Sequence, residues 1–239
     1  MWESISKKEK TWWGSQREWD TAPYLSACLW NITLEQILPG INMKDLQVID
    51  AGQKNVIFYG DPNRDQPLGF CSADAVVAWY IFLSLNKEAL DVFKWEIVVD
   101  LWAGDNTYGY QIANRAWAKI YIWVEPCNYE YLEHDISVLR AEDPEKYRVP
   151  AIVVREDMGR FLQRLPDNSV SIFCSGIDRF VLEEQYYRMA VWKEILRTLK
   201  KCYIWQNPRW HIEISYLPGY ENIKAEVFWD VWFTVYSKK

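Results

Sequence analysis

The stretch VVDLWAGDNTYGYQIANRAWAKIYIWVEP, from Val98 to Pro126, contains the three parts of a strand–helix–strand unit. An apolar run ends near Asp100, a turn of small and polar residues follows, and a helical pattern leads to a second apolar run that ends at Glu125. Two short apolar runs separated by one helix are typical of neighbouring parallel strands. The stretch therefore predicts an α/β fold with a parallel sheet at its centre.

The same alternation continues toward the C-terminus. Three more β-rich runs are interleaved with helical patterns, and the runs lie at 151–157, 169–175 and 202–206. Repeated crossovers of this kind are right-handed and place helices on both faces of the sheet. The final stretch, 224–239, is strand-rich without a helix and predicts an antiparallel hairpin at the sheet edge. For residues 95–239 we expect a doubly wound, mostly parallel, seven-stranded sheet with an antiparallel last strand.

The first 94 residues do not follow this alternation and are predicted to form an N-terminal extension. TLEQILPG reads as a short helix stopped by Pro39 and Gly40. The runs DLQVID and NVIFYG suggest a hairpin, and a helix is predicted over about 73–90, after a possible cap at Ser72. We consider the extension (1–94) a candidate cap on the substrate side of the domain formed by residues 95–239.

Composition limits the class of protein. Half of the 239 residues are hydrophobic and a quarter are charged, as in an ordinary globular domain. The net charge of −6 favours a small molecule or a protein over long nucleic acid as partner. The longest apolar run is too short to span a bilayer, and the N-terminus lacks the apolar core of a signal peptide, so we expect a cytoplasmic protein without a membrane partner. Five dispersed cysteines and two histidines disfavour both disulfides and a metal site.

Three predicted strands end in acids, namely Asp100, Glu125 and Asp157. In an open α/β sheet, ligands bind beyond the carboxyl ends of the strands, so these acids would lie beside one crevice. Glu125 follows Gly104 by about 20 residues, the spacing at which a carboxylate accepts hydrogen bonds from ribose hydroxyls. The pattern predicts a ligand of nucleoside type.

The stretch resembles the glycine-rich first motif of class I S-adenosylmethionine-dependent methyltransferases. Asp100 aligns with the acid of that motif, Gly104 and Asn106 align with its second and third glycines, and Trp102 stands at the first. The segments WVEP, Asp157-Met158 and LPDNSVSIFCSGID resemble the next strand ends of the family. The resemblance covers about Trp95 to Lys239 and implies the strand order 3-2-1-4-5-7-6.

The resemblance also implies a function and a set of site residues. It implies a methyltransferase that uses S-adenosyl-L-methionine and acts on a small molecule or a protein. Glu125 would bind the ribose, and Asp157 with Met158 would border the adenine. The methionine portion would face Asp100 and the turn that follows it, with Trp102, Gly104, Asp105 and Asn106. Ser175 and Asp178 would lie on the acceptor side, and Ser175 would also border the cofactor.

Two other readings remain open at this point. Trp102 would project into the methionine half of the site, which favours a catalytically inactive, methyltransferase-like interaction protein. An NAD(P)-dependent oxidoreductase also uses a glycine-rich turn and a ribose acid, but the third glycine of its motif would fall at Thr107. Three other residues, His134, His211 and Cys127, are weaker candidates for a functional role.

The tryptophans raise a separate question. The chain has 15 tryptophans and 10 glycines, whereas average usage gives about 17 glycines in this length. Trp102 stands in a turn approached by ligand and Trp117 at the left-handed end of a helix, and both places call for glycine. Trp123 stands at a strand end where the resemblance implies a glycine beneath the adenosine. We hypothesise that the gene encodes glycine there with the codon UGA. Codon UGG at these positions would exclude the hypothesis.

Overall fold

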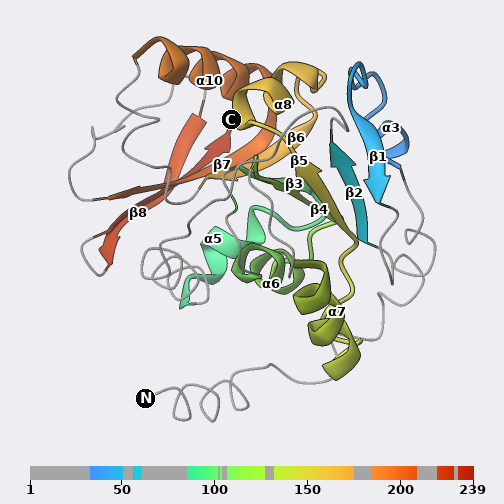
Figure 1. Cartoon of the computed structure of the whole chain (residues 1–239). Coiled ribbons are helices and arrows are strands. Elements are labelled where there is room, and N and C mark those ends of the chain that lie inside the picture. The colour runs from blue at the N-terminus through green and yellow to red at the C-terminus, as the bar shows by residue number, and fades with distance from the viewer. Residues whose placement is uncertain are drawn as a thin grey trace. The chain divides into compact units, whose positions relative to one another are not determined.

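A computed structural model gives the architecture of the chain. It describes residues 33–50, 56–60, 85–101, 103, 107–126, 132–174, 185–208, 220–228 and 231–239. The chain divides into two units, Met1–Asn31 and Ile32–Lys239, and every described residue belongs to the second. This second unit is built on one sheet of nine strands, in the order β1-β2-β5-β4-β3-β6-β7-β9-β8 (Figure 1).

Five parallel strands form the centre of the sheet. In spatial order they are β5 (Ala151–Arg155), β4 (Ile120–Val124), β3 (Ile97–Leu101), β6 (Val170–Cys174) and β7 (Leu199–Pro208). Each neighbouring pair is parallel. β3, β4 and β5 consist mainly of valine and isoleucine, which suits strands buried on both faces. The predicted parallel α/β sheet is confirmed, and EIVVDL supplies its central strand, β3.

The two N-terminal strands change the expected boundary of the sheet. β1 (Gln47–Asp50) and β2 (Val56–Gly60) form the predicted antiparallel hairpin. β2 also pairs in parallel with β5, from Val56 opposite Ala151 to Gly60 opposite Arg155. The stretch predicted as a separate extension therefore contributes two strands to the main sheet. The sheet consequently has nine strands and not the seven that were expected.

The C-terminal hairpin completes the other edge. β8 (Tyr220–Phe228) and β9 (Val231–Lys238) are antiparallel, and β9 inserts between β7 and β8 with an antiparallel register to β7. Counted along the sequence without the first hairpin, the remaining seven strands have the order 3-2-1-4-5-7-6.

Helices cover both faces of the sheet, as expected for a doubly wound fold (Figure 1). α5 (Lys87–Asp91), α6 (Tyr108–Arg115) and α7 (Leu132–Glu142) share a core with Val98, Tyr121 and Trp123 of the strands. α8 (Met158–Arg164), α10 (Gln185–Thr198) and the short α3 (Leu34–Ile37) share the opposite core. The latter contains Val99 and Leu101, the residues that alternate with Val98 and Asp100 on β3. This period-two alternation gives each face its own apolar layer.

A buried ion pair fastens the N-terminal segment to α8. Glu156, the residue after β5, accepts hydrogen bonds from Arg164 Nε at 2.6 Å and from Nη2 at 2.7 Å. Arg164 Nη1 donates to the carbonyl oxygens of Asn42, at 3.0 Å, and of Lys44. Because both charged side chains are almost fully buried, their pairing orders the segment that leads into β1. No helix within the described ranges is long and apolar enough to cross a membrane.

Candidate functional site

The predicted acids lie at the carboxyl ends of three adjacent strands of the parallel sheet. β3, β4 and β5 are adjacent, and their register places Leu101 opposite Val124 and Val124 opposite Val154. Asp100 is therefore level with Trp123, and Glu125 is two residues further along the strand direction. At about 3.3 Å per residue, Asp100 lies about 7 Å deeper than Glu125. The sheet thus brings Asp100 and Glu125 to the same end of the strands, with Asp100 further inside the sheet.

Asp100 forms a buried pair with Tyr121 of the neighbouring strand. The Tyr121 hydroxyl donates to Asp100 Oδ2 at 2.7 Å. Burial raises the pKa of the Asp100 carboxyl well above its usual range, the hydrogen bond from Tyr121 opposes this rise, and the negative charge of Glu125 adds to it. Burial also raises the pKa of Tyr121, so its hydroxyl remains a donor. The pair joins β3 to β4 inside the core shared with α6.

Gly109 of α6 packs directly on this pair. A Cβ atom at Gly109 would lie 2.1 Å from Asp100 Oδ2 and 2.4 Å from the Tyr121 hydroxyl. Only glycine allows the first turn of α6 to approach the strands so closely. Sequence reasoning did not single out Gly109 or Tyr121, although a glycine inside a helical pattern is a recognised sign of close packing.

The other carboxylate oxygen of Asp100 has no hydrogen-bond partner among the described residues. Asp100 is 2% exposed, and within the described part of the chain Oδ1 is buried without a partner. Buried polar atoms are almost always hydrogen-bonded, and an orphan atom often marks a place where a ligand or water binds. α6 begins nearby with Thr107 at its N-cap, whose side chain makes no capping hydrogen bond.

The backbone of Glu125 is held by a hydrogen bond to β5, at the carboxyl end of β4. Its backbone N–H donates to the Val154 carbonyl at 3.1 Å, which extends the β4–β5 ladder by one residue. The residue is 3% exposed, and its charge acts on Asp100. The predicted ribose-binding acid therefore lies directly after β4 and beside β5.

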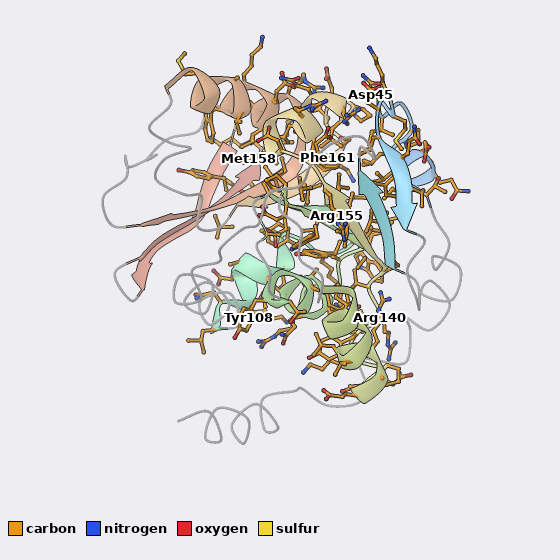
Figure 2. The ribbon with its side chains drawn as sticks, viewed as in Figure 1. Asp45, Tyr108, Arg140, Arg155, Met158 and Phe161 are labelled. Atoms are coloured by element: carbon orange, nitrogen blue, oxygen red, sulfur yellow. The ribbon has the colours of Figure 1, made fainter. Side chains whose placement is uncertain are left out.

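Asp157 caps the start of α8, and Met158 packs in the core. The Asp157 carboxylate caps α8 by accepting from the N–H groups of Gly159 at 2.9 Å and Arg160 at 3.1 Å. Met158 is buried with Phe161 between α8 and the sheet (Figure 2). Both residues follow β5, as predicted, and their assignment to the adenine stays a prediction.

Several predicted site residues lie outside the described part of the chain. These residues are Trp102, Gly104, Asp105, Asn106, Cys127, Ser175, Asp178 and His211. His134 is in α7, but its side chain is also outside the description. Their assigned roles remain predictions.

Two of the three questioned tryptophans are described, and they differ. Trp117 has φ 57°, the left-handed conformation that we predicted for the end of this helix. It occupies the C′ position of a complete Schellman motif, because Ala118 N–H donates to Ala113 O at 3.0 Å and Trp117 N–H donates to Asn114 O at 3.1 Å. Trp123 is instead an extended residue of β4 and fills the core on the α6 face. The backbone thus calls for glycine at 117 and not at 123.

Comparison with known proteins identifies relatives by structure alone. No family model and no curated protein sequence matches the chain. Many solved structures do match, and their named members are largely S-adenosylmethionine-dependent methyltransferases of the class I Rossmann-like fold.

Three of these structures indicate the extent of the likeness. The chain is similar to yhhF of Escherichia coli, a proposed methyltransferase, with TM-score 0.50 and 14% identity over 81% of this chain and 98% of that one. It is similar to a proposed methylase of Haemophilus influenzae, with TM-score 0.48 and 15% identity over 67% and 98%. It is also similar to TYW2 of P. horikoshii, solved in complex with MeSAdo, with TM-score 0.44 and 18% identity over 81% and 70%. On the evidence of its strand order and of the E. coli structure, the chain has the class I Rossmann-like fold of S-adenosylmethionine-dependent methyltransferases.

Proposed function

We propose that the chain is an S-adenosyl-L-methionine-dependent methyltransferase that acts on a small molecule or a protein. The observation that supports this most is the buried carboxylate of Asp100, at the carboxyl end of the central strand of a class I fold, with one oxygen that has no partner among the described residues. Glu125 follows the adjacent strand at the same edge. In this class of sheet, that edge is where a ligand binds.

The residues at the edge fit the chemistry of the cofactor. A carboxylate such as that of Glu125 can accept hydrogen bonds from both hydroxyls of a ribose. Asp100 Oδ1 can accept a hydrogen bond from the ammonium group of the methionine portion. When bound, the cofactor would supply an activated methyl group.

The remaining roles follow the resemblance described above. Trp102, Gly104, Asp105 and Asn106 belong to the turn that would face the methionine portion. Asp157 and Met158 would border the adenine, and Ser175 and Asp178 would lie toward the acceptor. Transfer to an acceptor that is already nucleophilic depends on alignment more than on an acid or a base, so we assign no catalytic side chain.

Calorimetry with S-adenosyl-L-methionine tests the proposal. The parent for the test is the Trp102→Gly variant, which removes the indole from the turn. Glu125→Ala in that parent should weaken binding at least tenfold, because it removes two charge-assisted hydrogen bonds worth about 1.5–3 kcal/mol each. Glu145→Ala removes an exposed carboxylate from the loop that leads into the amino end of β5, opposite to the carboxyl ends of the strands, and should leave the affinity unchanged.

The outcomes separate the ribose assignment from the function itself. If the parent binds the cofactor and Glu125→Ala binds it equally well, Glu125 does not hold the ribose. If the parent does not bind the cofactor at all, the proposed function is wrong. If the parent does bind the cofactor, a screen of small molecules and protein substrates with a labelled methyl donor would identify the acceptor.

A further inference from the structure

We propose that Tyr121 is a positioning residue of the cofactor site. Its hydroxyl holds Asp100 so that the second carboxylate oxygen of Asp100 faces the ammonium group of the cofactor. The inference rests on the proposed function. Tyr121 does not need to contact the ligand, because its role is exerted through Asp100.

The geometry leaves Asp100 one orientation. Oδ2 is held by the Tyr121 hydroxyl at 2.7 Å, and the backbone of Gly109 lies against the same oxygen. Oδ1 is the oxygen without a partner in the described residues. The hydroxyl and the close backbone therefore hold the plane of the carboxylate, so that one oxygen is occupied and the other is left available.

The groups around the Asp100 carboxyl determine the pH at which it is ionised and can bind a cation. Among the described residues, the titratable groups that act on Asp100 are the Tyr121 hydroxyl on β4 and the Glu125 carboxylate after β4. Gly109 of α6, which lies against Asp100, and Phe173, its register partner on β6, carry no charge. Because burial and Glu125 raise the pKa of Asp100, the free protein keeps a proton on Asp100 to a higher pH than an exposed aspartate would. A bound ammonium group favours the ionised carboxylate, so binding should release this proton.

Tyr121→Phe tests this in the Trp102→Gly parent. Its hydrogen bond stabilises the ionised form, so its loss raises the pKa of Asp100 further. We expect the pH at which the cofactor affinity reaches half of its maximum to move upward. Proton release, measured by calorimetry in buffers of different ionisation enthalpy, should also continue to a higher pH. Asp100→Asn should abolish the release.

The matched control is Tyr110→Phe. Tyr110 is another buried tyrosine of this core, but its hydroxyl donates to the Val149 carbonyl at 3.0 Å and not to Asp100. Its loss should lower the melting temperature without moving the pH profile. NMR titration of the Asp100 carboxyl in the free protein gives a second measurement, in which Tyr121→Phe should raise the pKa and Tyr110→Phe should not.

The contrary results are distinct. A parent that binds the cofactor with the same pH profile as Tyr121→Phe would overturn the role of Tyr121 while leaving the proposed function intact. An Asp100 titration that is unchanged in Tyr121→Phe would do the same. A parent that does not bind would overturn both.

A second inference comes from the backbone and is independent of the first. Four described residues other than glycine have positive φ: Asp45, Trp95, Trp117 and Asn168. Aspartate and asparagine tolerate this conformation, but a bulky aromatic residue there is an outlier. The two remaining residues are both tryptophan.

Trp95 occupies a turn that requires this conformation. Glu96 N–H donates to Phe93 O at 3.1 Å and closes a four-residue turn, in which Trp95 is the third residue, with φ 64°. A positive φ at this position of a turn is the preference of glycine. Trp95 N–H also donates to Trp117 O at 2.9 Å, so the two left-handed residues are joined at the amino end of β3. Trp95 is 49% exposed, so core packing does not account for its side chain.

We infer that 95 and 117 are both glycine positions and that the natural protein carries glycine at each. This adds position 95 to those named from the sequence. The codons, or the peptide masses of protein purified from its own source, test this directly. Codon UGG or a tryptophan-bearing peptide at either position would overturn the inference for that position.

A comparison of glycine and alanine tests the backbone requirement separately from the loss of the indole. At 95 and at 117, the glycine variant should melt about 2–4 °C above the alanine variant, because left-handed φ costs about 1 kcal/mol more with a Cβ atom. Trp192, in the middle of α10, provides the control. There the order should reverse, since glycine is the poorer helix former. An alanine variant as stable as the glycine variant at 95 and 117 would contradict the requirement.

Discussion

α6 and α8 begin at equivalent places in the fold, but only α8 has a side-chain cap at its first turn. Each follows a strand of the parallel sheet, β3 in one case and β5 in the other. α8 starts at Asp157, whose carboxylate accepts hydrogen bonds from two N–H groups of the first turn. α6 starts at Thr107, whose side chain makes no capping hydrogen bond, and the buried Asp100 carboxylate keeps one oxygen without a partner among the described residues.

The difference indicates where the fold leaves room for a ligand. The start of α8 is satisfied by its own chain, so nothing further is needed to stabilise it. At the start of α6, Thr107 provides no side-chain cap, and Asp100 keeps one oxygen without a partner in the described part of the chain. This arrangement is costly unless another molecule supplies the missing partners. Locally unfavourable features of this kind are common at functional sites.

Gly109→Ala should have the largest effect on the start of α6. The new Cβ atom would meet Asp100 Oδ2 at 2.1 Å, so the helix must move or the pair must break. Overpacking of this kind costs about 3 kcal/mol, measured as the free energy of unfolding in urea. The double variant Asp100→Ala with Gly109→Ala removes the oxygen and should recover part of the loss. Additive losses in the double variant would show that the contact with Asp100 is not the cause, since the contact with the Tyr121 hydroxyl remains in both variants.

Asp100→Asn should change how stability depends on pH. In the folded protein the pKa of Asp100 is raised, so folding disfavours its ionised form. This carboxyl therefore costs stability as pH rises above about 4, its value in the unfolded chain, and the cost levels off above the folded pKa. The asparagine variant lacks the cost, so its stability relative to the parent should increase with pH over that window. Denaturation at a series of pH values measures the difference, and a constant difference would mean that the carboxyl titrates normally.

The two helix caps give a smaller, matched contrast. Asp157→Ala removes the acceptor for two N–H groups and should lower the free energy of unfolding by about 1 kcal/mol. Thr107→Ala removes a side chain that makes no capping bond and should change it by less than about 0.5 kcal/mol. Equal losses in chemical denaturation would remove the distinction between the two helix starts.

The alternation of strands with helices and the strand-end acids were predictable because their signals are local, whereas the spatial order 3-2-1-4-5-7-6 came from the family resemblance. Val98–Leu101 and the runs that follow it show the β-strand and helix periods directly, and adjacent parallel strands place their last residues at one edge. The left-handed conformation of Trp117 was predictable for the same reason, since it depends on where α6 ends.

The contacts that were missed depend on residues far apart in the sequence. β2 joins β5 through a pairing of Val56 with Ala151, and no local pattern records the partner of a strand. Tyr121 reads as an ordinary strand residue, because its hydrogen bond to Asp100 exists only once β3 and β4 are aligned. Arg164 likewise donates to the carbonyl oxygens of Asn42 and Lys44, which lie 122 and 120 residues away in the sequence.

The central claim is that the turn after β3 serves backbone contact with S-adenosyl-L-methionine, and the thermal shift produced by saturating cofactor tests it most directly. A ligand that binds only the native state raises the apparent melting temperature. An indole adds about 150–250 Å² of surface to a turn that should present backbone, so Trp102 should block binding without preventing folding. We predict a clear upward shift for the Trp102→Gly variant and little or none for the chain with Trp102. Equal shifts in the two proteins would contradict this account of the turn, and no shift in either would contradict the proposed function.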